Sequence, residues 1–152
     1  MACEFSYNAI QSIGLNEALL LDTSIPCTKG YVYHEDQTGN FILRGIVNNP
    51  CNNFAEYKVT FIGNIAIADG GDVTPIAIAI VVNGEQRVIS RAISTPTLAG
   101  EYNNVTSSTI IKVPRGCCFN VAVEYVSAVT GAEVPTPSIN VQNANLTISR
   151  IA

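Results

Sequence analysis

The sequence is short of the side chains from which most catalytic and nucleic-acid-binding sites are built. It has one histidine and no tryptophan, and only 13% of its residues are charged, whereas an ordinary soluble domain has about 25%. Lys and Arg form no cluster, and the net charge is −4. A nucleic-acid partner is therefore not expected, because such binding depends on clustered cations.

Long hydrophobic runs are also absent. The longest apolar run, Ile76–Val82 (IAIAIVV), is far shorter than the roughly 20 residues that span a bilayer. The first residues, MACEFSYNAIQSIG, lack a basic segment followed by an apolar stretch, so we expect neither a membrane partner nor a secretion signal. Yet 47% of the residues are hydrophobic. Low charge with high apolar content predicts that other protein covers part of the surface, as in a subunit of an assembly.

Apolar and polar residues alternate along most of the chain, which is typical of half-buried antiparallel strands. Tyr57, Val59 and Phe61 would share one face of a strand, with Lys58 and Thr60 on the other. The segments 119–125 and 143–149 alternate in the same way. We therefore predict an all-β fold, an antiparallel two-sheet jelly-roll sandwich of about nine or ten strands.

Turn residues separate these segments at intervals suited to short strands. Asn83-Gly84 is the clearest turn, because both residues tolerate positive φ. It predicts a hairpin that joins Ile76–Val82 to Gln86–Ile93. Only Asn16–Asp22 (NEALLLD) could be helical, and it is short. The last segment alternates up to Ile151, so we expect it to be paired on both sides within a sheet.

The strand Ile76–Val82 is apolar on both faces, and one of these faces carries Ala77, Ala79 and Val81. A sheet of a two-layer sandwich has one core face, so a dry second face favours close approach by a neighbouring subunit. The alternative is that loops of the same chain cover it.

The order of several motifs resembles a known family. A Tyr-x-Val-x-Phe strand (Tyr57–Phe61) precedes an apolar strand that ends in Asn83-Gly84-Glu85, and a corner at Val113–Gly116 precedes the final strand, NANLTISRIA. This order is similar to the jelly roll of tumour necrosis factor (TNF)-like ligands and complement globular heads. It most resembles the bacterial and phage branch, which comprises spore-surface domains and virion surface proteins.

The resemblance implies a homotrimer in which the sheet containing the first and last strands packs around the threefold axis. The predicted interface is formed by the apolar strand Ile76–Val82 and by the final strand. Its residues are Ile76, Ala77, Ile78, Ala79, Ile80, Val81, Leu146 and Ile148.

With no Gly-X-Y stalk and no secretion signal, the resemblance further implies a non-enzymatic phage structural protein. It would be made in the host cytoplasm and would decorate the capsid surface or form part of a head fibre. Residues 1–15 are predicted to be an anchoring segment that binds the major capsid protein or another virion protein through Phe5, Tyr7 and Ile10. Residues 16–152 would form one jelly-roll domain.

Two other functions stay open. The polar loops HEDQTGN (34–40) and NNPCNNF (48–54) could bind a host-surface glycan or a receptor protein, although aromatic residues for stacking on sugars are scarce. The chain could also be a trimeric domain of a bacterial spore or cell surface.

The five cysteines are expected to be mainly structural. Consecutive strand residues face opposite ways, so Cys117 would join the apolar face and Cys118 the polar one. The odd count argues against an intrachain disulfide framework. A metal site is the alternative, because Cys27, Cys51, Cys117 and Cys118 could meet near His34. No short Cys-x-x-Cys spacing supports it, and we expect no cofactor.

Catalytic motifs are missing. Any Ser-His-Asp or Cys-His arrangement would have to use His34, and no phosphate loop or G-x-S-x-G motif occurs. We therefore expect no enzyme. Ala68–Asp72 (ADGGD) could suggest calcium, but its spacing does not match an EF-hand loop and favours a turn. The sequons at Asn104 and Asn145 are interpreted as strand-edge polar residues.

Overall fold

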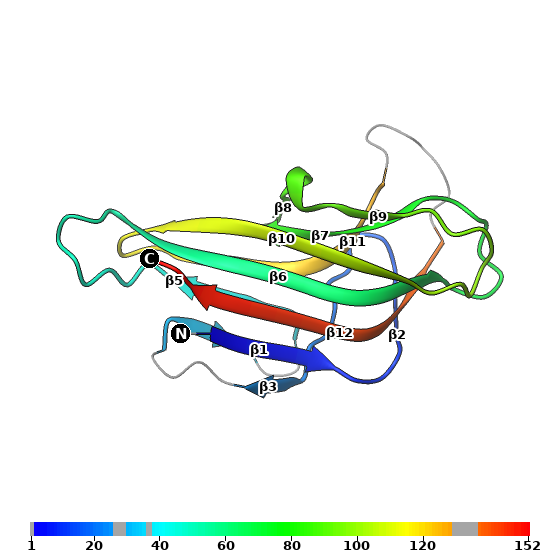
Figure 1. The fold of residues 1–152 in the computed structure, drawn as a ribbon, viewed down its shortest axis with the longest axis horizontal. Helices are drawn as coiled ribbons and strands as arrows, with labels where there is room; N and C mark the ends of the chain where they lie inside the picture. Colours follow the sequence, from blue (N-terminus) through cyan, green and yellow to red (C-terminus); the bar gives the residue numbers. More distant parts are fainter. Residues whose placement is uncertain (1, 26–29, 36–37, 129–136) are drawn as a thin grey trace.

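The computed structural model describes residues 2–25, 30–35, 38–128 and 137–152. In these residues the chain forms an all-β sandwich of two antiparallel sheets (Figure 1). They include no helix that could span a lipid bilayer. The elements are β1 (Ala2–Tyr7), β2 (Gln11–Ile13), β3 (Thr23–Ile25), β4 (Val32–His34), β5 (Phe41–Arg44), β6 (Phe54–Ile67), β7 (Ile76–Val82), β8 (Glu85–Gln86), the 3-10 turn η1 (Val88–Ser90), β9 (Ala92–Ser94), β10 (Asn103–Pro114), β11 (Cys118–Val126) and β12 (Ile139–Arg150).

Each sheet has six described strands. The first sheet has the order β10-β6-β12-β1-β3, and β2 also pairs with β12. The second sheet has the order β4-β5-β11-β7-β8, and β9 pairs with β7. Many neighbouring strands, such as β1 and β12 or β5 and β11, are distant in sequence, as expected for a jelly roll. The predicted fold class is confirmed.

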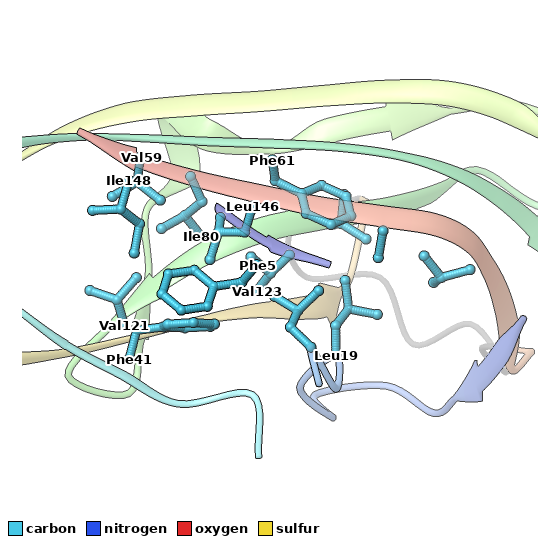
Figure 2. Close-up of a cluster of buried hydrophobic side chains, with 14 of the residues drawn as sticks. Phe5, Leu19, Phe41, Val59, Phe61, Ile80, Val121, Val123, Leu146 and Ile148 are labelled. Atoms are coloured by element: carbon cyan, nitrogen blue, oxygen red, sulfur yellow. The ribbon is translucent and has the colours of Figure 1, made fainter. Parts of the chain in front are cut away.

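The core lies between the sheets and follows the predicted alternation. Tyr57, Val59 and Phe61 of β6 are fully buried, whereas Lys58 between them is exposed. Side chains from both sheets interdigitate in the close-up of Figure 2, where Phe5 of the first sheet lies beside Phe41 of the second. Their ring centroids are 4.5 Å apart. Burial of these apolar faces is the main force that holds the sandwich together.

The Asn83-Gly84 turn is present, with φ of 51° and 84° at its two residues. The strand expected after it is broken, however, because η1 interrupts it between the short strands β8 and β9. The Ser90 hydroxyl accepts a hydrogen bond from the Ile80 amide (3.0 Å). Ser90 of η1 thus satisfies a backbone donor of β7 at a point where strand pairing is interrupted.

The segment NEALLLD is not helical. The Leu19 amide donates to the Val123 carbonyl (2.8 Å), and Ala18 forms a bridge with Glu124. Leu19 and Leu21 are buried in the core. The segment therefore runs as extended chain beside β11, where its alternate leucines gain more from burial than from a short helix.

The first strand belongs to the sheet rather than to a separate anchor. β1 pairs with β12 from Ala2↔Ser149 to Tyr7↔Ala144, and with β3 on its other side. The proposed boundary between residues 1–15 and 16–152 is therefore wrong as a structural division. β12 pairs with both β1 and β6, so the expectation that the last strand lies inside a sheet is confirmed.

One end of the sandwich is fastened by Arg150 and Tyr57. The Arg150 guanidinium donates to the Ile46 carbonyl (2.6 Å) and lies over the Tyr31 ring, 4.5 Å from its centroid. The Tyr57 hydroxyl donates to the Arg44 carbonyl (2.5 Å), and burial raises its pKa. These contacts tie the end of β12 to the chain segments around β5, and thus join the two sheets.

We predict that Phe5→Ala lowers the free energy of unfolding by about 3–5 kcal/mol, because it leaves a cavity between the sheets. Glu4→Ala is the matched control on the exposed side of the same strand and should change it by less than about 0.5 kcal/mol. Urea unfolding followed by tyrosine fluorescence measures both. Equal midpoints for the two variants would contradict the core position of β1.

Candidate interaction surfaces

The eight side chains predicted at the subunit interface are buried within the single chain, each at most 4% exposed. Those that face the core between the sheets are Ile76, Ile78, Ile80, Leu146 and Ile148. On the opposite face of β7, Ala77 and Ala79 form a second cluster with Val126, against which Ala128 packs, and Val81 is also buried. The dry second face of β7 is therefore covered within the chain. This specific interface assignment is wrong, because these residues present no free surface.

The predicted capsid anchor is divided by the fold. Phe5 is 3% exposed and belongs to the core, where it also contacts the His34 ring. Tyr7 is half-buried and packs against the core. Only Ile10, which is 54% exposed, is available to a partner. Phe5 therefore cannot serve as an anchor without unfolding β1.

The outer face of the first sheet is broad and mainly polar, and its four charged side chains, Glu4, Glu56, Lys58 and Lys112, are balanced in sign. Its side chains come from alternate positions of β10, β6, β12 and β1 that point away from the core. Most are Asn, Gln, Ser or Thr, and three exposed apolar side chains, Phe54, Ile62 and Ile110, lie among them. Its polar side chains include Thr60, Asn64, Asn104, Thr106, Ser108, Asn140, Gln142, Asn145, Thr147 and Ser149.

Several of these polar groups are paired across the strands. Thr60 and Ser108 share a hydrogen bond of 3.1 Å, and the Asn104 amide donates to the Asn64 side-chain oxygen (3.2 Å). Such cross-strand pairs hold side chains flat against the sheet. We call this face, formed by the outward residues of β10, β6, β12 and β1, the polar sheet face.

A second surface lies along one long edge of the sandwich, where η1 and β9 lie beside β10 (Figure 1). Ile89 is 88% exposed, and Val88 and Ile93 are more than half exposed. The Asn103 amide donates to the Ser94 hydroxyl (3.1 Å), which links β9 to β10. We call Val88, Ile89 and Ile93 the apolar edge. Sequence reasoning missed it because this segment was expected to be a regular strand.

The single histidine has a structural environment. The His34 ring stacks on Phe41 with a centroid distance of 4.5 Å and an interplanar angle of 12°. Its Nε2 lies 2.9 Å from the Thr38 carbonyl oxygen. Both contacts fix the ring beside its own loop. His34 therefore holds residues 38–40 against the end of β4.

The described residues contain no group of three or more His, Cys, Asp or Glu side chains placed to hold a metal ion. Asp69 and Asp72 are exposed, and the Gly71 amide donates to the Ala68 carbonyl (3.0 Å) with Gly70 at φ 83°. ADGGD is thus a turn, in agreement with the interpretation favoured from its sequence.

The cysteines differ from expectation in two respects. Cys117 is exposed, as are Cys118 and Cys51. Cys117 precedes β11 in a turn in which its amide donates to the Pro114 carbonyl (3.0 Å), so it does not reach the core face. Cys3 is disulfide-bonded, whereas an intrachain disulfide was not expected. Cys27 lies outside the described residues.

Two hollows flank the β7–β8 hairpin. A cavity of about 460 Å³ is lined by Val82, Asn83, Glu85, Gln86 and Arg87. A smaller one, of about 140 Å³, is lined by Asn16, Val81, Gly84, Gln86, Glu124 and Val126. Burial raises the pKa of the Glu124 carboxyl. The loop around Cys51 borders a third hollow of about 180 Å³.

Comparison with solved structures identifies the fold. The globular domain of zebrafish complement 1qA protein aligns with a TM-score of 0.63 at 10% identity, covering 99% of this chain and 97% of that one. Eiger TNF from S. frugiperda aligns at 0.65 and 9% identity (100% and 92%), and murine APRIL at 0.55 and 10% identity (99% and 100%). The chain thus has the TNF/C1q-like jelly-roll fold. No family model and no curated protein matches the sequence.

We predict that Glu124→Gln raises the thermal midpoint at pH 7 and leaves it unchanged well below pH 4. The raised pKa means that the folded state holds the proton more tightly than the unfolded chain. The folded state therefore loses stability as the pH rises through the raised pKa of Glu124 and the carboxyl ionises. The amide of Gln does not ionise, so the variant does not lose this stability. Melting curves of both proteins between pH 3 and 8 provide the measurement, and parallel curves would contradict the prediction.

Proposed function

We propose that this protein is a homotrimeric, non-enzymatic assembly module whose polar sheet face packs around a threefold axis. The observation that carries the proposal is this broad face, which combines paired, uncharged side chains with the exposed Phe54, Ile62 and Ile110. The face carries two acidic and two basic side chains, of which Lys112 and Glu56 are already paired (3.4 Å), so its burial removes few unpaired charges from water.

A ring of three copies requires two different surfaces that fit each other, because its interfaces are heterologous. The apolar edge supplies the second surface. Ile89 is the most exposed of the large hydrophobic side chains in the described residues, and it belongs to η1, which contacts β10. Placing the apolar edge of one copy against the polar sheet face of the next would cover both.

The non-enzymatic part of the proposal is supported by the state of the single histidine. Any triad would need a free ring nitrogen oriented toward a nucleophile. His34 instead stacks on Phe41 and uses Nε2 near the Thr38 carbonyl. The fold itself does not decide between catalysis and binding.

We further propose that the trimer is a phage virion protein that decorates the capsid or forms part of a head fibre. The support is the resemblance of motif order to virion surface proteins together with the low charge of the chain. Docking would use the major capsid protein or another virion protein as partner. Because Phe5 is buried, Ile10 and the loops at one end of the sandwich would make that contact.

Light scattering during size exclusion should give three times the chain mass of 16.2 kDa. Ile62→Asp should weaken the trimer by about 100-fold or more, because its cross-strand neighbours Thr106 and Asn145 are uncharged and leave the new carboxylate unpaired in the interface. Tyr33→Asp is the control, since Tyr33 is similarly exposed (49%) but lies on β4 of the second sheet. A wild-type monomer at micromolar concentration would refute the trimer, and loss in both variants would refute the assigned face.

Antibodies raised against the purified protein should label phage particles in electron micrographs, at sites on the head. Mass spectrometry of the same particles should detect the chain. A glycan array probed with the trimer provides the contrast. Unlabelled particles together with specific glycan binding would replace the virion proposal by a carbohydrate-binding surface module, and labelling of spores would replace it by a spore-surface domain.

A further inference from the structure

Two groups of charged side chains, of opposite sign, lie at the two ends of the sandwich. The long strands run along the long axis of the sandwich, so its two ends are made of loops and strand termini (Figure 1). The end that carries the C-terminus is formed by residues 44–53, 112–119 and 149–152, which neighbour one another through β6, β10 and β12 pairing. These three segments contain Arg44, Lys112, Arg115 and Arg150, and no Asp or Glu. We call this the basic end.

The opposite end has the reverse character. It is formed by residues 8–18, 67–76 and 95–103, which are joined by contacts such as the Gly100 amide donating to the Ile67 carbonyl (2.9 Å). These segments contain Glu17, Asp69, Asp72 and Glu101, and no Lys or Arg. We call this the acidic end.

The arginines of the basic end are fixed by uncharged acceptors and are not neutralised. The Arg115 guanidinium donates to the Asn49 and Asn52 carbonyls at 2.7 and 2.6 Å, both of which are uncharged acceptors. Arg44 donates to the Gly30 carbonyl (3.3 Å). Within the described residues, the one ion pair at this end joins Lys112 to Glu56 (3.4 Å). The end therefore keeps a net positive charge in a defined arrangement.

The backbone at this end is also tightly packed. The Gly45 amide donates to the Cys117 carbonyl (2.8 Å), and a Cβ on Gly45 would lie 2.0 Å from the Pro114 carbonyl oxygen. Only glycine allows this approach of β5 to the β10–β11 turn. Since the turn carries Arg115, the cations sit on a preorganised surface that loses little entropy on binding.

The acidic end is similarly ordered in part. The Glu101 carboxylate accepts hydrogen bonds from the Thr97 amide and hydroxyl, both at 2.8 Å, which lower its pKa. Asp69 lies beside Gly100, since a Cβ there would meet its carboxylate oxygen at 3.6 Å. Asp69 of one loop thus lies beside the loop that carries Glu101.

We propose that the basic end of one copy docks onto the acidic end of another, so that the molecules associate head to tail along the long axis. Opposite charges on the two ends of one chain favour self-association over a foreign acidic partner, because both halves of the contact are present. A heterologous contact that does not close on itself builds an open filament. The contact does not use the apolar edge, and of the charged side chains on the polar sheet face it uses only Lys112 at the end of β10, so it can form between single chains or between the proposed trimers.

Two double variants test the contact. Arg44→Glu/Lys112→Glu reverses the basic end and leaves Arg115 in place to hold its loops, and Asp69→Lys/Asp72→Lys reverses the acidic end. Wild-type protein in about 20 mM salt should sediment as a series of species whose masses are multiples of the smallest one, which is either the single chain or the proposed trimer. Raising the salt to about 300 mM should weaken this association at least about tenfold. Each variant alone should sediment only as the smallest species.

A mixture of the two variants in equal amounts should restore association, because each then presents the charge that the other needs. The control Thr23→Glu/Ser24→Glu adds negative charge on the exposed strand β3, away from both ends, and should leave the ladder unchanged. Failure of the mixture to associate, or a ladder that persists in either variant alone, would overturn the proposal.

The native thiols provide an independent measurement. Cys51, Cys117 and Cys118 are exposed at the basic end, whereas the exposed Val73 lies at the acidic end. Val73→Cys treated with a short bismaleimide at low salt should give long crosslinked series on a denaturing gel. The same variant with all three native thiols changed to serine should give none beyond pairs.

The outcomes separate this inference from the proposed function. A ladder built on the mass of one chain supports the docking of ends and refutes the trimer. A trimer that stays single at low salt, at every concentration, refutes the docking of ends alone. Binding of polyglutamate to such a trimer would assign the basic end to a foreign acidic partner.

Discussion

The structure depends on the burial of two alternating apolar faces against each other. The long strands β6, β10 and β12 contribute every second side chain to a single layer of core, and mainly polar side chains occupy their remaining positions. Both sheets gain stability only when they are closed over this layer. β1 is part of that closure because Phe5 contacts Phe41 across the core, so removal of β1 would leave part of the core uncovered.

The fold was largely predictable because a period of two is a strong local signal. The alternation in β6, β11 and β12, and the Asn83-Gly84 turn, all specify geometry over a few residues. The exposed surfaces were not predictable, because a local pattern does not show which other segment covers a strand. The dry second face of Ile76–Val82 could be covered by another subunit or by the chain itself, and sequence periodicity is identical in the two cases.

The interruption by η1 illustrates what local patterns omit. Val88, Ile89 and Ser90 fit a strand by composition, yet the Ser90 hydroxyl binds the β7 backbone and turns its two neighbours outward. Likewise, Cys117 falls outside the core face because β11 starts one residue later. Both differences arise from a boundary or a tertiary hydrogen bond, and both change which residues a partner can contact.

The pairing of Ala2 with Ser149 joins two strands that are synthesised far apart in time. During synthesis β1 must wait until β12 has been made before its main partner exists, and contacts of such separation slow folding. Until then the nascent β1 presents an open backbone edge to other polypeptides. The sequence separation of β1 and β12 thus prolongs the time for which this edge is exposed during folding.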